Sequence, residues 1–416
     1  MQAGRTGRAS RFGAGFAPVP LALGGMLGAG VFTGLGPAAA AAGWWLLAGL
    51  PLAALLAACA AVVSAEQADA FPGPGANYAC VRSKLGVVPA RMCASAHVAG
   101  SVAAMAAVAR SVESYLAPAV PAGSAAIAIL LVVLASTTGL RIRGGAAWLW
   151  LGLVLVVLGV VVAACLAVAP ASSTSGNAVG GDRAVGITGA AGVLFFAFLG
   201  FERVTAPTDE RDRCARRAGR TGVLVACVAV TGVLALVGFA LLRQLGPARL
   251  ALSPAPVRDA LGAAAASDLG PLVGTAVAVA MLPALLAALE TARSTPLAAV
   301  RDGELPASLA RTGGSGTPFV LDLVLGGLAA VLAFFASPAG ALAFASCCLL
   351  LHHAFAGAAG RVLLLDGPRW MRWSSCLGMA LAVVLAMSMP VAALLGTAAV
   401  VVAGPVAGWM VARLRR

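Results

Sequence analysis

Apolar runs of about twenty residues follow one another along nearly the whole chain and leave only short connections between them. A helix that crosses the hydrocarbon core of a bilayer needs ~20 predominantly apolar residues. Hydrophobic residues make up 61% of the 416 residues and charged residues only 10%, a balance that excludes a soluble globular domain. The sequence therefore predicts an all-α polytopic membrane protein.

The apolar runs predict twelve transmembrane helices, and an even number of spans places both termini on the same side of the membrane. The predicted spans are residues 16–42, 44–64, 92–116, 122–140, 146–169, 185–206, 221–245, 270–299, 318–336, 339–358, 374–390 and 392–412.

The basic residues in the connections between these spans indicate which side is cytoplasmic. Of the 28 lysines and arginines, 23 fall on the side of the termini and 5 on the other side. Cytoplasmic connections carry such an excess. We therefore expect a multi-pass protein of the cell membrane with both termini cytoplasmic. The net charge of +13 reflects this orientation signal, and we expect no nucleic-acid partner.

Two spans contain matching interruptions, "GGMLGAGVF" in the first and "FFAFLGFE" in the sixth. Broken helices at corresponding places in two halves are typical of transporters built from inverted repeats. The first half would be residues 16–169 and the second 185–358, each with five spans. Two further spans, 374–412, follow, and 1–15 and 413–416 would be cytoplasmic tails. We thus expect helices one and six to be discontinuous.

The glycines of the first span have three possible explanations. A dinucleotide site would require a preceding strand and a downstream acidic residue, and the membrane context speaks against it. Gly30 and Gly34 form a GxxxG pair that would let another helix pack closely. A break at mid-membrane would instead free amides that bind an anion at a helix start. The matching break in span six favours the third explanation, and packing and breaking can coexist.

Four stretches resemble the amino acid–polyamine–organocation (APC) permeases. In chain order they are "GGMLGAGVFTGLGPAAAAAG", "SAEQADAFPGPGANYACVRSKLG", "FFAFLGFERVTAPTDERDRCARR" and "ETARSTPLAAVRDGELPASLARTGGSGTP". The resemblance implies the LeuT-like fold, a five-plus-five inverted repeat with two terminal helices. It also implies a secondary transporter that moves amino acids or related amines by alternating access. An exporter or exchanger of the same fold is the alternative, and a membrane-embedded enzyme is a more distant one.

The resemblance also implies roles for particular residues. The substrate carboxylate would meet backbone amides of Gly28, Ala29 and Gly30. The substrate ammonium would meet carbonyl groups of helix six, and Phe196 would cover the substrate like a lid. His97 and Ser101 lie one helical turn apart on span three, which lines the pocket of the family. The residues of helix six in this prediction are Phe195, Phe196, Ala197 and Phe198.

Two acids of the spans are expected to act in gating or proton coupling. A carboxylate within an apolar helix costs ~3 kcal/mol and is functional by default. Glu202 follows the break in span six, although an interfacial pair with Arg203 would also explain it. Glu290 lies in span eight, where it could instead pair with Arg293. His352 and His353 are expected to be structural.

The sequence leaves the coupling ion open between a proton and sodium. Some proton-coupled members of the family carry a lysine in helix five, and the lone lysine of this chain is Lys84. Few charged residues fall in the expected pocket, which favours neutral substrates. Histidines and acids lack the spacing of a metal or nucleophile site, so we expect no enzyme activity, no cofactor and no metal.

The predicted orientation can be tested by cysteine labelling. Single cysteines at Ser173 and Ser308, placed in a cysteine-free background, should react with an impermeant maleimide from outside and from inside, respectively. Reaction of both from the same side would contradict the orientation.

Overall fold

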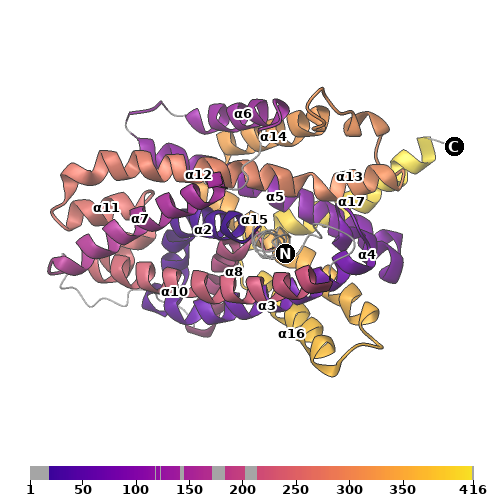
Figure 1. Cartoon of the computed structure of the whole chain (residues 1–416), viewed down its shortest axis with the longest axis horizontal. Helices are drawn as coiled ribbons and strands as arrows, with labels where there is room; N and C mark the ends of the chain where they lie inside the picture. Colours follow the sequence, from indigo (N-terminus) through magenta and orange to yellow (C-terminus); the bar gives the residue numbers. More distant parts are fainter. Residues whose placement is uncertain are drawn as a thin grey trace, which may run out of the picture.

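The computed structural model describes residues 18–117, 119–121, 123–140, 145–170, 183–201 and 213–414. These residues form a bundle of helices, most of which run along its long axis (Figure 1). Within the described ranges the structure contains helices and no strand. A helix satisfies its backbone hydrogen bonds internally, which is the condition for crossing a bilayer.

The first part of the chain forms helices that are long and apolar, apart from one short polar helix, α4. Their bounds are α2 (Pro18–Ala42), α3 (Leu46–Ala70), α4 (Ala76–Leu85), α5 (Val87–Leu116), α6 (Ser124–Thr137) and α7 (Gly145–Ala167), with a 3₁₀ turn η1 (Gly43–Trp45) between α2 and α3.

The second part begins with α8 (Arg183–Phe195), which continues as the 3₁₀ turn η2 (Phe196–Phe198). The helices that follow are α10 (Arg213–Leu252), α11 (Pro256–Ala263), α12 (Gly270–Ala292), α13 (Ser294–Arg301), α14 (Phe319–Phe335), α15 (Pro338–Leu363), α16 (Arg369–Met387) and α17 (Val391–Leu414), with the short 3₁₀ turns η3 (Ser267–Leu269) and η4 (Ala307–Ala310).

Length and apolar composition identify a polytopic membrane protein. Eight helical stretches of the described chain are long and apolar enough to cross a membrane, and the first of them, Ala22–Ala70, includes both α2 and α3. Three shorter apolar helices accompany them: Ser124–Thr137, Ala184–Phe198 and Phe319–Phe335. Predicted bounds agree closely with several helices, as for span 318–336 and α14 at Phe319–Phe335.

The predicted break in the first span is wrong for this structure, because α2 is one continuous helix from Pro18 to Ala42. Its glycines are used for close packing instead. A Cβ atom on Gly30 would lie 2.1 Å from Cβ of Ala197, and one on Gly24 would lie 2.8 Å from the Trp150 ring. Glycine lets a neighbouring backbone or ring approach where any side chain would collide.

In the sixth span, α8 ends where the sequence predicts the break, and residues 202–212 lie outside the described part of the chain. The α-helix ends at Phe195, and the 3₁₀ turn Phe196–Phe198 follows. Leu199 then has extended dihedral angles, and Gly200 has a φ of 123°, a region that glycine adopts at little cost. The chain therefore leaves the helical path inside the bundle, beside α2.

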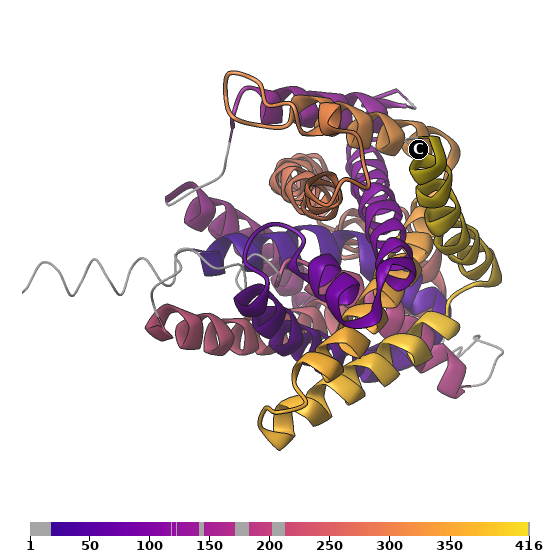
Figure 2. The ribbon, with the colours of Figure 1, turned by 90° about the vertical axis from the view of Figure 1, so that its right-hand side faces the viewer.

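The bundle has two ends, each marked by a short helix, and one outer layer made of two helices. In Figure 1, α11 lies at one end and α4 at the opposite end. We refer to these as the α11 end and the α4 end. Helices α6 and α14 pack side by side as an outer layer, which Figure 2 shows at the top of the molecule. Helix α5 packs against α15, α12, α17 and α14 and so occupies the interior.

Gly30→Ala should destabilise the protein, because its methyl group would overlap Ala197, and overpacking costs about 1–3 kcal/mol. Gly159→Ala is the matched control, because Gly159 lies on an exposed face of α7 and nothing lies within 4 Å of a Cβ atom there. We expect a lower midpoint of thermal unfolding in detergent for Gly30→Ala and an unchanged or raised one for Gly159→Ala. Equal midpoints would contradict the packing explanation.

Candidate functional site

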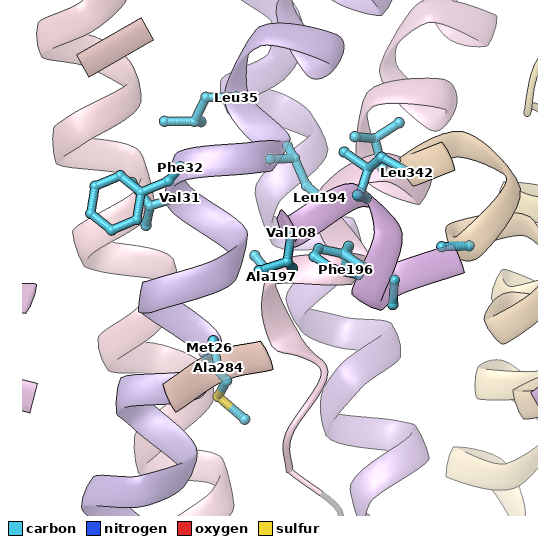
Figure 3. Close-up of a cluster of buried hydrophobic side chains, with 14 of the residues drawn as sticks. Met26, Val31, Phe32, Leu35, Val108, Leu194, Phe196, Ala197, Ala284 and Leu342 are labelled. Carbon is cyan, nitrogen blue, oxygen red and sulfur yellow. The ribbon is translucent and has the colours of Figure 1, made fainter. Parts of the chain in front are cut away.

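A cavity of about 80 Å³ lies beside the break that ends α8. Helices α2, α5, α12 and α15 complete its wall. The lining is mostly apolar, and its polar side chains are His97, Ser101, Thr291 and His353. Figure 3 shows Val108, Phe196 and Ala197 close together at the end of α8, with Met26 and Ala284 nearby. A concave, largely apolar space with few polar groups is typical of a small-molecule site.

Helix α2 lines this cavity with a face different from the predicted one. Ala22, Gly25 and Ala29 face the cavity, three residues whose spacing puts them on one side of a helix. Gly28 is buried near the Ala280 carbonyl oxygen and the Trp150 ring, and Gly30 is buried against Ala197. Of the three predicted positions on α2, the structure brings Ala29 alone into the cavity wall.

Helix α5 contributes the predicted pair His97 and Ser101, which both line the cavity. Ala104 and Val108 continue the same wall. His97 is 2% exposed and Ser101 5% exposed, so both polar side chains are held away from solvent. Their role as substrate contacts stays a prediction.

Among the predicted residues of the sixth span, Phe196 lines the cavity, and so do Leu199 and Gly200 beyond it. Phe195 turns its ring toward His353 at a centroid distance of 5.4 Å. Ala197 packs on Gly30, and Phe198 is fully buried. The turn η2 thus places one aromatic ring at the cavity and uses the others for packing.

The two predicted acids have different outcomes. Glu202 lies outside the described residues, so its role stays a prediction. Glu290 precedes Thr291, which lines the cavity. Arg293, the partner suggested for Glu290, forms its ion pair with Asp322 of α14.

The Arg293–Asp322 pair is buried where α6, α14 and the start of α13 meet. Nη2 of Arg293 donates to Oδ2 of Asp322 at 2.7 Å, and Nε donates to Oδ1. Ser136 of α6 donates to Oδ2 of Asp322 at 3.0 Å and accepts from Arg293. A buried charge needs such partners, because removing one typically costs 3–5 kcal/mol.

At the α11 end, Tyr115 lines a wider depression of about 910 Å³. The Tyr115 hydroxyl donates to the Phe32 carbonyl oxygen at 3.5 Å and accepts from the Val257 amide at 3.4 Å. Its ring meets the Phe32 ring edge-on at 5.9 Å. Helices α2, α5 and α11 are therefore joined above the cavity on this side.

At the α4 end, an ionic network ties α4 and α5 to the loop after α13. Arg82 contacts Asp302 at 3.2 Å and Glu304 at 2.8 Å, and Arg91 contacts Glu304 at 2.6 Å. The network closes the second end of the bundle.

Comparison with known proteins decides the family. The family model described as amino acid permease matches residues 17–413. Proteins named uncharacterized transporters from Mycobacterium bovis and Mycobacterium tuberculosis are 37% identical over 401 residues, which cover 95% of this chain and 90% of each relative. The chain belongs to the amino acid permease family.

The histidines of α15 are the part of this permease site that the sequence did not predict. His353 lines the cavity, and His352 lies against His97 with ring centroids 4.6 Å apart. No local spacing connects His97 with residues about 255 positions later, so the available signal was the scarcity of histidine, three in 416 residues. Among the described residues of the permease, no group of three or more His, Cys, Asp and Glu could hold a metal ion.

The ionic network gives the permease a testable dependence on pH. Burial raises the pKa of Glu304, but the hydrogen bonds and charges of Arg82 and Arg91 outweigh it, so the pKa lies below its ordinary value of 4.5. A lowered folded-state pKa stabilises the protein above the unfolded-state pKa, and this contribution is lost as the pH falls through the folded-state pKa.

Glu304→Gln should therefore lower the midpoint of thermal unfolding at neutral pH, and its deficit against the wild type should shrink below the ordinary pKa of 4.5. Asp366→Asn, at an exposed position, is the control and should leave the midpoint unchanged. A deficit that stays constant from pH 7 to acid would exclude an electrostatic role for Glu304.

Proposed function

We propose that this permease is a secondary active transporter of amino acids, or of related amines, in the cell membrane, and that it works by alternating access. The observation that carries the proposal is the cavity at the end of α8, which contacts α2, α5, α12 and α15 and lies between closures at the two ends of the bundle. The family and the transporter names of the relatives support it.

The chemistry of the cavity supports a substrate with both an ammonium and a carboxylate. Helix α8 ends at the cavity, and the last carbonyl groups of a helix carry partial negative charge that favours a cation. Ser101 and Thr291 supply hydroxyl groups that can donate to a carboxylate. Contact with amides of Gly28, Ala29 and Gly30 would require α2 to open locally during the cycle, since the helix is continuous here.

The lining also limits the side chain of the substrate. Within the described lining no Asp, Glu, Lys or Arg is present, and twelve of its sixteen residues are Ala, Gly, Val, Leu or Phe. The cavity of about 80 Å³ is large enough for a few water molecules, because each water molecule needs ~10–15 Å³ of such volume. We therefore propose small, neutral amino acids as the substrate class.

The proposed topology has twelve spans, with both termini and the α4 end in the cytoplasm. The halves 16–169 and 185–358 would be related as inverted repeats, and 374–412 would add two spans. The excess of basic residues on the α4 side supports this orientation. The broken sixth span supports a site at the interface of the halves. Glu202 and Glu290 remain the proposed acids of gating.

Direction and coupling separate this proposal from its alternatives. An exporter or exchanger would have the same fold and the same cavity, because gradients determine the direction of net transport. Counterflow in proteoliposomes tests substrate binding and exchange without any gradient of ions. We expect labelled small neutral amino acids to accumulate in liposomes preloaded with the same unlabelled amino acid, and larger or charged ones to fail.

Ala29→Leu should abolish counterflow, because its side chain would fill much of the cavity from the α2 wall. Ala40→Leu on the same helix points to an exposed surface and should leave counterflow within about twofold of the wild type. Both variants should purify as folded protein. Normal counterflow by Ala29→Leu would show that the substrate binds elsewhere.

A further inference from the structure

All three histidines of the chain form one buried cluster within the bundle. His97 comes from α5, and His352 and His353 come from α15. The ring centroids are 4.6 Å apart for His97 and His352, and 5.1 Å apart for His352 and His353. Each side chain is at most 4% exposed. We call His97, His352 and His353 the histidine cluster.

The cluster meets the cavity on one side. His97 and His353 both line it. Nδ1 of His97 is buried without a hydrogen-bond partner in the structure. Leaving a buried polar atom without a partner costs about 1–3 kcal/mol, so a purely structural histidine would be a costly choice at this position. An atom in this situation is available to a proton or to a ligand in the cavity.

On its other side the cluster reaches toward the α4 end. Nδ1 of His352 lies 3.3 Å from the carbonyl oxygen and 3.2 Å from the thiol sulfur of Cys93. Nε2 of His352 lies 3.4 Å from Nδ2 of Asn77 on α4, and this amide group can donate to it. Asn77 is half-buried on α4, the helix that lies at this end of the bundle in Figure 1. The cluster thus extends from the cavity to the helix that closes this end.

The charges around the cluster bear directly on its protonation. The polar and titratable side chains near it include the thiol of Cys93 on α5, the amide of Asn77 on α4 and the hydroxyl of Thr291 across the cavity on α12. Cys59, Ser64 and Ser375 border a small void together with His353, and the rings of Phe195 and Phe201 pack on His353. Glu290 of α12 interacts electrostatically with Asp322, and α2 contains no titratable residue from Pro18 to Ala42.

We propose that the histidine cluster binds the proton that drives transport. This inference rests on the proposed transporter function and deepens it by naming the coupling ion and its site. Histidine is the side chain whose ordinary pKa, ~6.5, allows a charge change near neutral pH. Imidazoles about 5 Å apart repel each other when charged, so the cluster holds one proton at a time.

The cycle then needs only proton binding and release. With the cavity open to the outside, Nδ1 of His97 accepts a proton, and the neutral imidazole becomes an imidazolium. The positive charge lies in the cavity wall, where a substrate carboxylate compensates it. When the cavity opens at the α4 end, the cluster returns the proton to water on the cytoplasmic side, and the substrate loses its counter-charge.

Proton-driven accumulation in proteoliposomes tests the proposal. A pH difference of about one unit, acid outside, can drive about tenfold accumulation by a carrier that takes one proton with each substrate. We expect this accumulation for the wild type and none for His97→Gln or His352→Gln, while counterflow of His352→Gln, whose side chain is not part of the described cavity lining, stays measurable. Cys347→Ala, on the α15 face toward α16, is the control and should accumulate substrate like the wild type.

Two results would overturn the proposal. The first is that the single variants His97→Gln, His352→Gln and His353→Gln each accumulate substrate to the same level as the wild type. The other is loss of accumulation in Glu202→Gln alone, which would move the proton site to that acid. Absence of counterflow by the wild type for every amino acid would instead contradict the proposed function.

A measurement on the wild type does not depend on any variant folding. Since the chain has three histidines, nitrogen-15 labelling of histidine in a protein without a histidine tag reports on the cluster alone. We expect imidazole signals to titrate between about pH 5 and 8 and to shift when substrate is added. Signals that stay neutral throughout this range, with and without substrate, would show that the cluster carries no proton.

Discussion

The contact between Gly30 of α2 and Ala197 of η2 determines how the interior of this permease is arranged. The two backbones approach so closely that no side chain fits between them at Gly30. The end of α8 is therefore held directly against an unbroken helix, and the chain turns away through Leu199 and Gly200. The space left beside this turn is the cavity, whose position follows from the absence of one methyl group.

The sequence predicted the helices well because a bilayer allows few solutions. Apolar length alone located α14 and α17 to within a few residues, and the glycine and aromatic residues of "FFAFLGFE" located the end of α8. The glycines of α2 were harder to interpret. A glycine that weakens a helix and a glycine that admits a neighbouring helix look the same in one sequence. The packing role becomes visible only in the structure, where Gly30 contacts Ala197, 167 residues later, and Gly24 contacts Trp150, about 125 residues later.

The cavity was predicted in part for the same reason. His97 and Ser101 share a helical face, so local periodicity was sufficient to pair them. His353, Thr291 and Leu349 join them only through the packing of α5 against α12 and α15, which no local pattern contains. The ion pairs show the same limit: Arg293 has Glu290 one turn earlier, yet its carboxylate partner is Asp322 on another helix.

Helices α6 and α14 are unusually short for elements that form the outer layer of a membrane protein. With 14 and 17 residues, they extend about 21 and 26 Å at 1.5 Å per residue, less than the ~30 Å of a typical hydrocarbon core. Their outward side chains, such as Leu131 and Phe334, are apolar and exposed. For helices of this length to span the bilayer, the lipid beside this face would have to thin, at a cost of a fraction of a kcal/mol per Å. The thickness of the surrounding membrane would then act on the Arg293–Asp322 junction, and through it on the end of α12.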